Sequence, residues 1–136
     1  MTIRVLLADD NPTFRAAVRQ FLSALPATAV AGEAHNGREA LELAASLAPD
    51  LVLLDIGMPE MNGLEAARRM QQWQEPPLVV FLSMHNGQAY REAARQVGAT
   101  GFISKADFVD ELPRVIETVE ARMRALASAQ VPGVAE

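Results

Sequence analysis

The sequence contains no cysteine and few aromatic residues, with one tryptophan and one tyrosine among 136 residues. The lack of cysteine excludes disulfide bonds and thiolate metal sites, and it suits a reducing compartment. No apolar run approaches the roughly 18 residues of a membrane span. The N-terminus also lacks the charged-then-apolar pattern of a secretory signal. We therefore expect a cytoplasmic protein with no membrane partner.

Basic residues are too few for a surface that grips nucleic acid. Twelve Lys and Arg stand against seventeen Asp and Glu, which gives a formal net charge of -5. Nucleic-acid binding depends on many cationic contacts with phosphates, so a negative net charge disfavours it. We expect no direct nucleic-acid binding by this domain, and any effect on DNA has to come from a separate output domain.

Length and hydrophobic content indicate one domain. The chain has a mass of 14.7 kDa and half of its residues are hydrophobic, which is enough for a single core. We assign this domain to residues 1–127. The final stretch, SAQVPGVAE at 128–136, predicts a flexible tail or the start of a linker.

Five short apolar runs alternate with five segments whose apolar residues recur at helical spacing. The runs are IRVLLA (3–8), TAVAGEA (28–34), LVLLD (51–55), LVVFLS (78–83) and GFIS (101–104). The helical segments are Phe14–Leu25, Ala40–Leu47, Leu64–Met70, Ala89–Val97 and a stretch within Phe108–Leu126. Runs that are apolar on both faces suit a buried parallel sheet. We predict an α/β fold in which a parallel sheet is buried between helical layers.

Polar residues follow four of these runs, at the end where a parallel sheet binds its ligands. Asp9 and Asp10 follow the first run, Asp55 ends the third, Ser83 ends the fourth and Lys105 follows the fifth. Because the carboxyl ends of parallel strands meet at one edge, we expect these side chains to converge on one crevice.

Three clustered carboxylates repel one another unless a cation neutralises them. Oxygen ligands without His or Cys favour Mg²⁺, which also accepts phosphate oxygens. Lys105 adds a positive charge on the opposite side. A carboxylate between a metal ion and an ammonium can attack a phosphoryl group, because both cations stabilise its oxygens. The residues therefore predict an aspartyl-phosphate site.

The motifs LLADDNP, DLVLLDIGMPEMNGLE, VVFLSMH and GATGFISKA stand in this order along the chain. With them, residues 2–127 resemble the receiver domain of two-component response regulators. The residues around the predicted site most resemble those of the subgroup often fused to a helix-turn-helix DNA-binding domain. The resemblance implies a doubly wound, flavodoxin-like sheet with strand order 2-1-3-4-5, an order that the family shares with a chemotaxis receiver.

The resemblance also implies roles for the site residues. Asp55 would be the phosphoacceptor and also a ligand of Mg²⁺. Asp10 would be the main Mg²⁺ ligand, Asp9 would assist through water, and the carbonyl of Gly57 would be a further ligand. Lys105 would pair with the phosphoryl group. Such a domain takes its phosphoryl group from a sensor histidine kinase or a phosphotransfer protein, and it catalyses only its own phosphorylation and dephosphorylation.

Ser83 stands where the family has its switch hydroxyl, and Phe102 where it has its switch aromatic residue. Phosphorylation would then alter the face formed by the fourth helix, the fifth strand and the fifth helix. That face would control an output domain or a homodimer. Specificity for the kinase would lie on the first helix, around Phe14–Phe21.

Three features depart from the family or vary within it. Ala106 follows the lysine, where receivers commonly have a proline in a cis peptide. Gly57 and His85 occupy positions that tune dephosphorylation in the family. A glycine leaves water easy access, so we expect a fairly short-lived phosphoryl group. Pro113 falls within the last helical pattern, where it should either kink the helix or delay its start.

The same residues allow other interpretations. Asn11 and Pro12 can simply begin a helix, a role compatible with a neighbouring metal site. A flavin-binding module would need a Gly/Ser/Thr-rich phosphate loop, whereas the loop after the first run is acidic. A hydrolase of the aspartyl-phosphate type carries Asp-x-Asp-x-Thr, and DIGMP has no second carboxylate. The remaining alternative is a receiver-like docking domain that works without phosphorylation.

Overall fold

The structure, a computed structural model, describes residues 2–84 and 87–130. Within these residues the chain forms five strands, at the positions that the apolar runs predict. The strands are β1 (Ile3–Ala8), β2 (Thr28–Ala34), β3 (Leu51–Asp55), β4 (Leu78–Ser83) and β5 (Gly101–Ser104).

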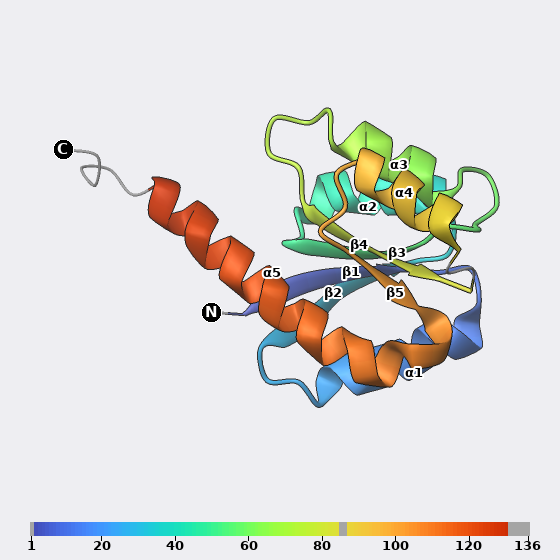
Figure 1. The fold of residues 1–136 in the computed structure, drawn as a ribbon, viewed down its shortest axis with the longest axis horizontal. Coiled ribbons are helices and arrows are strands. Elements are labelled where there is room, and N and C mark those ends of the chain that lie inside the picture. Colours follow the sequence, from blue (N-terminus) through green and yellow to red (C-terminus); the bar gives the residue numbers. More distant parts are fainter. Residues whose placement is uncertain (1, 85–86, 131–136) are drawn as a thin grey trace.

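Helices cover both faces of the sheet (Figure 1). They are α1 (Pro12–Ser23), α2 (Gly37–Leu47), α3 (Gly63–Met70), α4 (Gln88–Gln96) and α5 (Phe108–Gln130). The first and last lie on one face, and α2, α3 and α4 lie on the other. Strand and helix alternate along the chain, which confirms the predicted α/β class.

The five strands form one parallel sheet in the order β2-β1-β3-β4-β5. This confirms the order that the resemblance implied. The order reverses between β1 and β3, so their carboxyl ends border the crevice expected of a doubly wound sheet. In register, Ala8 of β1 pairs with Leu54, and Leu54 pairs with Phe81 of β4. The residues that follow these strands therefore emerge at the same edge.

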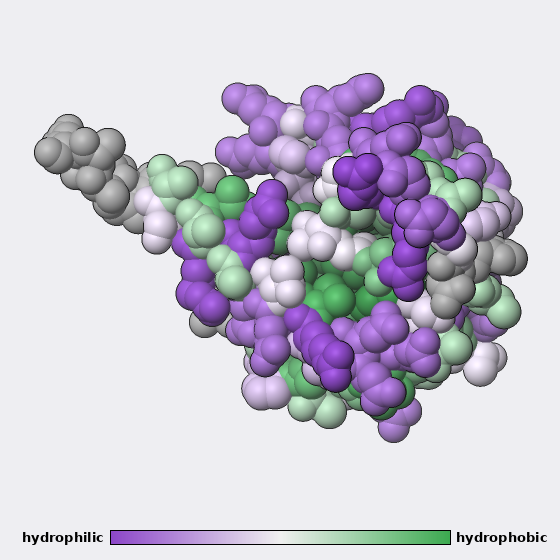
Figure 2. All heavy atoms as spheres, in the orientation of Figure 1, coloured by the Kyte–Doolittle hydropathy of each residue, from purple (hydrophilic) through white to green (hydrophobic). Residues whose placement is uncertain are grey.

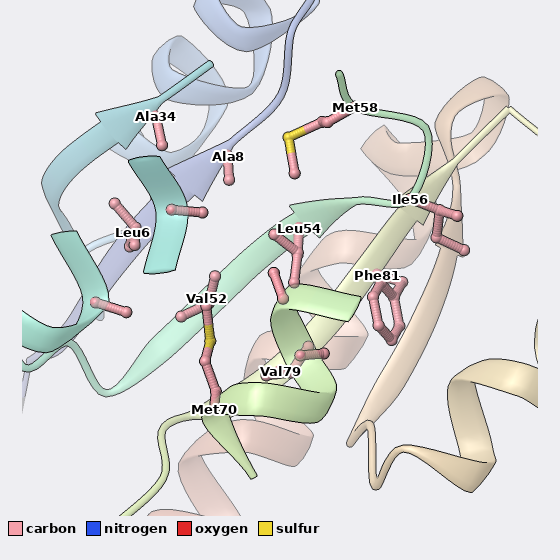
Figure 3. Packing of buried hydrophobic residues seen from close by; sticks show 14 of the residues in the cluster. Leu6, Ala8, Ala34, Val52, Leu54, Ile56, Met58, Met70, Val79 and Phe81 are labelled. Carbon is pink, nitrogen blue, oxygen red and sulfur yellow. The ribbon is translucent and has the colours of Figure 1, made fainter. Parts of the chain in front are cut away.

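The sheet has a hydrophobic cluster on each face. The cluster under α2, α3 and α4 includes Leu54, Met58, Met70 and Phe81, whose side chains meet between sheet and helices (Figure 3). The other cluster joins the sheet to α1 and α5, with residues such as Leu112 fully buried. Burial on both faces explains why the sequences of the inner strands β3 and β4 are almost continuously apolar.

Asparagine begins three of the helices at the carboxyl edge of the sheet. Asn11 Oδ1 accepts hydrogen bonds from the backbone N–H groups of Thr13 and Phe14, at 3.0 and 3.1 Å. Asn36 and Asn62 accept equivalent bonds at the starts of α2 and α3. Such caps satisfy the free N–H groups of the first turn. The caps fix the residue at which each loop at this edge ends and its helix begins.

The C-terminal helix excludes one of the two alternatives that Pro113 left open, the delayed start. A 3₁₀ turn, Lys105–Asp107, leads into α5, which starts before Pro113 and includes it, so the proline does not delay the helix. Proline removes one helical hydrogen bond. Leu112 and Ile116 are buried on either side of it and hold the helix on the sheet across this point.

The two ends of this C-terminal segment bear on two expectations from the sequence. The helix continues to Gln130, so residues 128–130 are helical rather than part of a tail. The expectation for 131–136 lies outside the described residues. The peptide after Lys105 is trans, as are the other described peptides. No helix in the described part of the chain has the length and apolar character needed to span a bilayer.

Candidate functional site

The predicted site residues converge at the carboxyl edge of the sheet. Asp9 and Asp10 follow β1, and Asp55 ends β3. Each of the three offers a carboxylate oxygen, and these oxygens lie within 4.8 Å of one another. Asp9 and Asp55 are buried, whereas Asp10 is exposed. The expectation that the three carboxylates share one crevice is therefore met.

Backbone groups hold Asp9 in place at the end of β1. Its own N–H donates to the carbonyl of Ala34 on β2, at 3.0 Å. Its Oδ1 accepts a hydrogen bond of 2.8 Å from the backbone N–H of Asn11. Because Asn11 also caps α1, the buried carboxylate is tied to both the sheet and the helix.

Lys105 reaches the acidic cluster from the far side. Its Nζ lies 2.7 Å from Asp9 Oδ2 and 3.4 Å from Asp55 Oδ2. The lysine side chain is only 11% exposed. Its Nζ also lies 4.6 Å from the ring centroid of Phe14, a cation–π contact that orients the ammonium. The lysine thus bridges two carboxylates that would otherwise repel each other.

The environment of Asp55 favours its neutral form. Burial, and after it the negative charge of Asp9, raise the pKa of the Asp55 carboxyl from 3.8 to about 6. Lys105 and the N–H of Gly57, which donates to Asp55 Oδ1 at 3.3 Å, act in the opposite direction. A cation added to the cluster would relieve this penalty by neutralising the carboxylates.

The loop after β3 is shaped by two glycines. Gly63 begins α3 against the backbone of β3, and a Cβ atom there would lie 2.1 Å from the carbonyl oxygen of Asp55. Its N–H donates to the carbonyl of Ile56 at 2.8 Å, which closes the loop. Gly57, in contrast, faces open space, because a Cβ there would meet nothing within 4 Å. The loop is thus tight behind Asp55 and open beside it.

The residues present fit a magnesium ion. The donor set consists of carboxylates, the hard oxygen ligands that Mg²⁺ prefers. Asp9 Oδ2 is buried, and no described residue donates a well-aligned hydrogen bond to it, although the Lys105 ammonium is close. An exposed Asp10 leaves one side of the cluster open to water, which Mg²⁺ retains when bound.

Ser83 lies on β4, the strand next to that of Asp55, and Phe102 lies on β5, one strand further out. Leu82 of β4 pairs with Asp55, and Ser83 is the next residue, 1% exposed. Phe102 of β5 is partly buried against the core under α4, and the Arg91 guanidinium carbon lies 4.7 Å from its ring centroid. The switch roles of Ser83 and Phe102 stay predictions. His85 lies outside the described residues.

Sequence reasoning missed two contributors to the site. Phe14 was expected only on the kinase-facing helix, yet its ring contacts Lys105. Arg15 was not singled out, yet its Nη1 donates to the carbonyl of Asp9 at 2.6 Å. The cap at Asn11 is the signal that was available, because it places both residues in the first turn of α1 beside the acidic pair.

A doubly wound sheet of this order, with an acidic cluster and a lysine at its carboxyl edge, defines the receiver class of signalling domains. The family described as the response regulator receiver domain matches residues 5–117. The chain belongs to this family.

A similar response regulator supports the same assignment. The nitrate/nitrite response regulator protein NarL of Escherichia coli (strain K12) is 37% identical over 131 residues, which cover 96% of this chain and 61% of NarL. The chain therefore spans about three fifths of that relative.

Solved structures agree. A two-component response regulator of the LuxR family from Aurantimonas sp. SI85-9A1 has a TM-score of 0.83 and 34% identity, covering 89% of this chain and 86% of that one. The response regulator domain of Thermotoga maritima CheB has a TM-score of 0.80 and 30% identity, covering 88% and 98%. The similarity to NarL and to the LuxR-family regulator supports the subgroup that the motifs indicated.

Proposed function

We propose that this domain accepts a phosphoryl group on Asp55 in the presence of Mg²⁺ and thereby changes the surface it presents to a partner. The observation that carries this proposal is the position of Asp55. Its carboxylate shares a crevice with Asp9 and Asp10, and the ammonium of Lys105 lies 3.4 Å from its Oδ2. The donor would be a sensor histidine kinase or a phosphotransfer protein.

In the transfer step, an Asp55 carboxylate oxygen attacks the phosphorus atom of the donor. An O–P bond forms, the P–N bond of the donor phosphohistidine breaks, and the imidazole nitrogen keeps the electron pair. Lys105 is placed to donate to the phosphoryl oxygens, where negative charge gathers. The open side of Gly57 gives the donor, and later water, a path to the same phosphorus.

Asp10, Asp9, Asp55 and the carbonyl of Gly57 would hold the metal, with Asp10 as the main ligand. When bound, Mg²⁺ supplies positive charge that offsets repulsion between the carboxylates and the incoming phosphate. The chain prepares this site by fixing the buried Asp9 through Asn11 and Ala34, and by leaving Asp10 exposed.

The modification would reach a partner through the edge of the sheet next to the site. Ser83 would donate to the phosphoryl group, and Phe102 would turn inward, altering the face of α4, β5 and α5. In Figure 2 hydrophobic surface is visible between the upper helices and α5, bordered by hydrophilic side chains. Surface of this kind suits association with a second copy or with an output domain. DNA would then be controlled only through such an output domain.

The deciding experiment is phosphorylation by a small donor. Acetyl phosphate with Mg²⁺ should add one phosphoryl group, seen as a mass increase, at Asp55, and beryllofluoride should bind at the same place. Asp55→Asn should abolish both, and chelation of Mg²⁺ should do the same. The matched control is Asp50→Asn, because Asp50 also lies beside β3 but at the opposite end of that strand.

Labelling of Asp55→Asn at the wild-type rate would contradict the assignment. A wild-type protein that binds a kinase yet takes up no phosphoryl group from that kinase or from acetyl phosphate would instead support the docking domain that works without phosphorylation. The complete acidic set beside Lys105 argues against that alternative.

A further inference from the structure

We infer that Arg15 is a positioning residue for the metal site, clamping the loop that carries Asp9 and Asp10 to the edge of the sheet. The inference rests on the proposed function, since it concerns the same Mg²⁺ ligands. Arg15 is in the first turns of α1 and touches none of the three carboxylates of the cluster in the contacts described for it. Its effect on the metal has to pass through the backbone.

The clamp consists of two bonds from one guanidinium. Nη1 donates to the backbone carbonyl of Asp9 at 2.6 Å, and Nε donates to Glu33 Oε1 at 3.0 Å. Glu33 belongs to β2, which pairs with β1 through Leu7. The Arg15 side chain is only 19% exposed, so this geometry is shielded from water. A planar guanidinium can make both bonds in one fixed orientation, which an ammonium cannot.

The carbonyl that Arg15 holds belongs to the residue immediately before Asp10. Asp10 itself is exposed, and its position depends on the backbone on either side of it. On one side Asn11 caps α1, and on the other side Arg15 fixes Asp9. Releasing the second support frees the peptide that leads into the main metal ligand. A ligand that must be ordered on binding binds more weakly.

Arg19 provides a matched control within the same cluster. Its Nη1 donates to Glu33 Oε2 at 2.8 Å, and this is the carboxylate that Arg15 also uses. Its contacts do not include the Asp9 carbonyl, and its side chain is 51% exposed. Replacing either arginine therefore removes one positive charge near the acidic cluster, but only Arg15 supports the loop.

The two possible roles of Arg15, as a charge and as a clamp, predict opposite changes in Mg²⁺ affinity when it is removed. If Arg15 acted only as a charge, its removal would strengthen Mg²⁺ binding, because a nearby cation repels the metal. If it acts as a clamp, its removal weakens binding. The direction of the change in Mg²⁺ affinity therefore separates the two roles, and this measurement does not depend on phosphorylation.

The experiment is a titration with Mg²⁺ alone, followed by calorimetry or amide NMR, on the wild type, Arg15→Ala, Arg15→Lys and Arg19→Ala. We expect the Mg²⁺ dissociation constant of Arg15→Ala to rise about tenfold, the usual scale for a group that orients a metal ligand. The Mg²⁺ dissociation constant of Arg15→Lys should lie between those of the wild type and Arg15→Ala. Arg19→Ala should match the wild type or bind slightly more tightly. Thermal unfolding without Mg²⁺ shows which variants are folded.

Arg15→Lys supplies a second route if Arg15→Ala does not fold. It keeps the positive charge but loses the planar fork that reaches both the Asp9 carbonyl and Glu33, so Mg²⁺ affinity should fall although the net charge is unchanged. Mg²⁺ binding by Arg15→Ala and Arg15→Lys as tight as by the wild type would overturn the clamp and leave the phosphoacceptor site standing. A wild type that binds no Mg²⁺ would overturn the metal site, and the clamp with it.

Discussion

Lys105 lies closer to Asp9 than to Asp55, with Nζ at 2.7 Å from Asp9 Oδ2 and 3.4 Å from Asp55 Oδ2. Its shorter contact is thus with the carboxylate that the proposal does not assign as phosphoacceptor. The ammonium compensates the buried charge of Asp9 and leaves Asp55 only partly neutralised. A phosphoryl group on Asp55 would offer additional oxygens to the same ammonium. The lysine would then act as a sensor whose preferred partner changes with phosphorylation.

Removing the ammonium tests this sensor. Lys105→Ala should bind Mg²⁺ at least as tightly as the wild type, because a competing cation has been taken from the carboxylates. Its response to beryllofluoride, followed by amide NMR, should be strongly reduced because the contact with the phosphoryl group is lost. Lys105→Arg should rescue poorly, since a planar fork does not replace a compact point charge. Equal responses in wild type and Lys105→Ala would rule out this role.

The raised pKa of Asp55 predicts a stability gain on its removal. Folding holds the carboxylate in a site that favours its neutral form, so the native state binds protons more tightly than the unfolded state between pH 4 and 6. Stability contributed by this group is therefore present below about pH 4 and is lost as the pH rises through about 6. A difference of two pH units corresponds to about 3 kcal/mol. Asp55→Asn, which is neutral at every pH, should gain up to about this much at pH 7.

Urea unfolding with a chelator present, at pH 7 and pH 4, measures the gain. At pH 4 the advantage of Asp55→Asn should largely disappear, because the wild-type carboxyl is then protonated in the native state. Asp10→Asn is the control, since Asp10 is exposed. A gain of the same size at both pH values would show that the raised pKa is not its cause.

Gly63 should tolerate no side chain. In Gly63→Ala the new Cβ would meet the Asp55 carbonyl oxygen at 2.1 Å, so the backbone of β3 or α3 has to move. Overpacking of this kind typically costs about 1–3 kcal/mol. We expect a loss in the upper part of that range in urea unfolding, together with weaker beryllofluoride binding. Gly57→Ala is the matched control, because its Cβ enters open space, and it should retain both properties.

We expect the open space at Gly57 to shorten the lifetime of a phosphoryl group on Asp55. Water can approach the phosphorus over a residue with no side chain, so the wild type should lose the group quickly. Gly57→Leu adds bulk on this side and should slow hydrolysis several-fold without changing the metal ligand, which is a backbone carbonyl. The decay of phosphorylated protein after removal of acetyl phosphate gives the rate. Equal rates in the two proteins would show that access at Gly57 does not control dephosphorylation.

The alternation of apolar runs and helical segments was sufficient to predict every strand boundary. Strands buried on both faces have almost no polar residues, so their ends are sharp in the sequence. Pro113 shows where the pattern was ambiguous. Whether a helix passes through a proline depends on the packing of residues such as Leu112 and Ile116 against the sheet, and a single sequence does not display that packing.

The candidate site was predictable to the level of the carboxylates and the lysine, because these residues directly follow strands. The supports around them were not. Arg15 reaches a backbone carbonyl and Phe14 presents a ring to Lys105, and both contacts depend on the angle at which α1 leaves β1. That angle follows from tertiary packing rather than from spacing along the chain.

Phe102 is the residue whose movement would carry the signal. Its ring packs between the core under α4 and the guanidinium of Arg91, a contact that favours the present, partly exposed position. If Ser83 moves toward a phosphorylated Asp55, the space behind it becomes available to the ring. Phosphorylation would then favour an inward state that the unmodified protein has to sample already for this shift to occur.

Ser83→Ala should still accept a phosphoryl group on Asp55 but fail to shift this population, because the hydroxyl that donates to the phosphoryl group is missing. Phe102→Tyr should retain the shift and Phe102→Ala should lose it, since the size of the ring fills the vacated space. Arg91→Ala should move the unmodified protein toward the inward state, because the cation–π contact on the outward side is gone. Amide NMR of β5 and α4, with solution scattering before and after beryllofluoride, would follow both the ring and the association state. If β5, α4 and the association state stay unchanged while Asp55 is fully occupied, Ser83 and Phe102 serve only as a strand-end residue and a core residue in this protein.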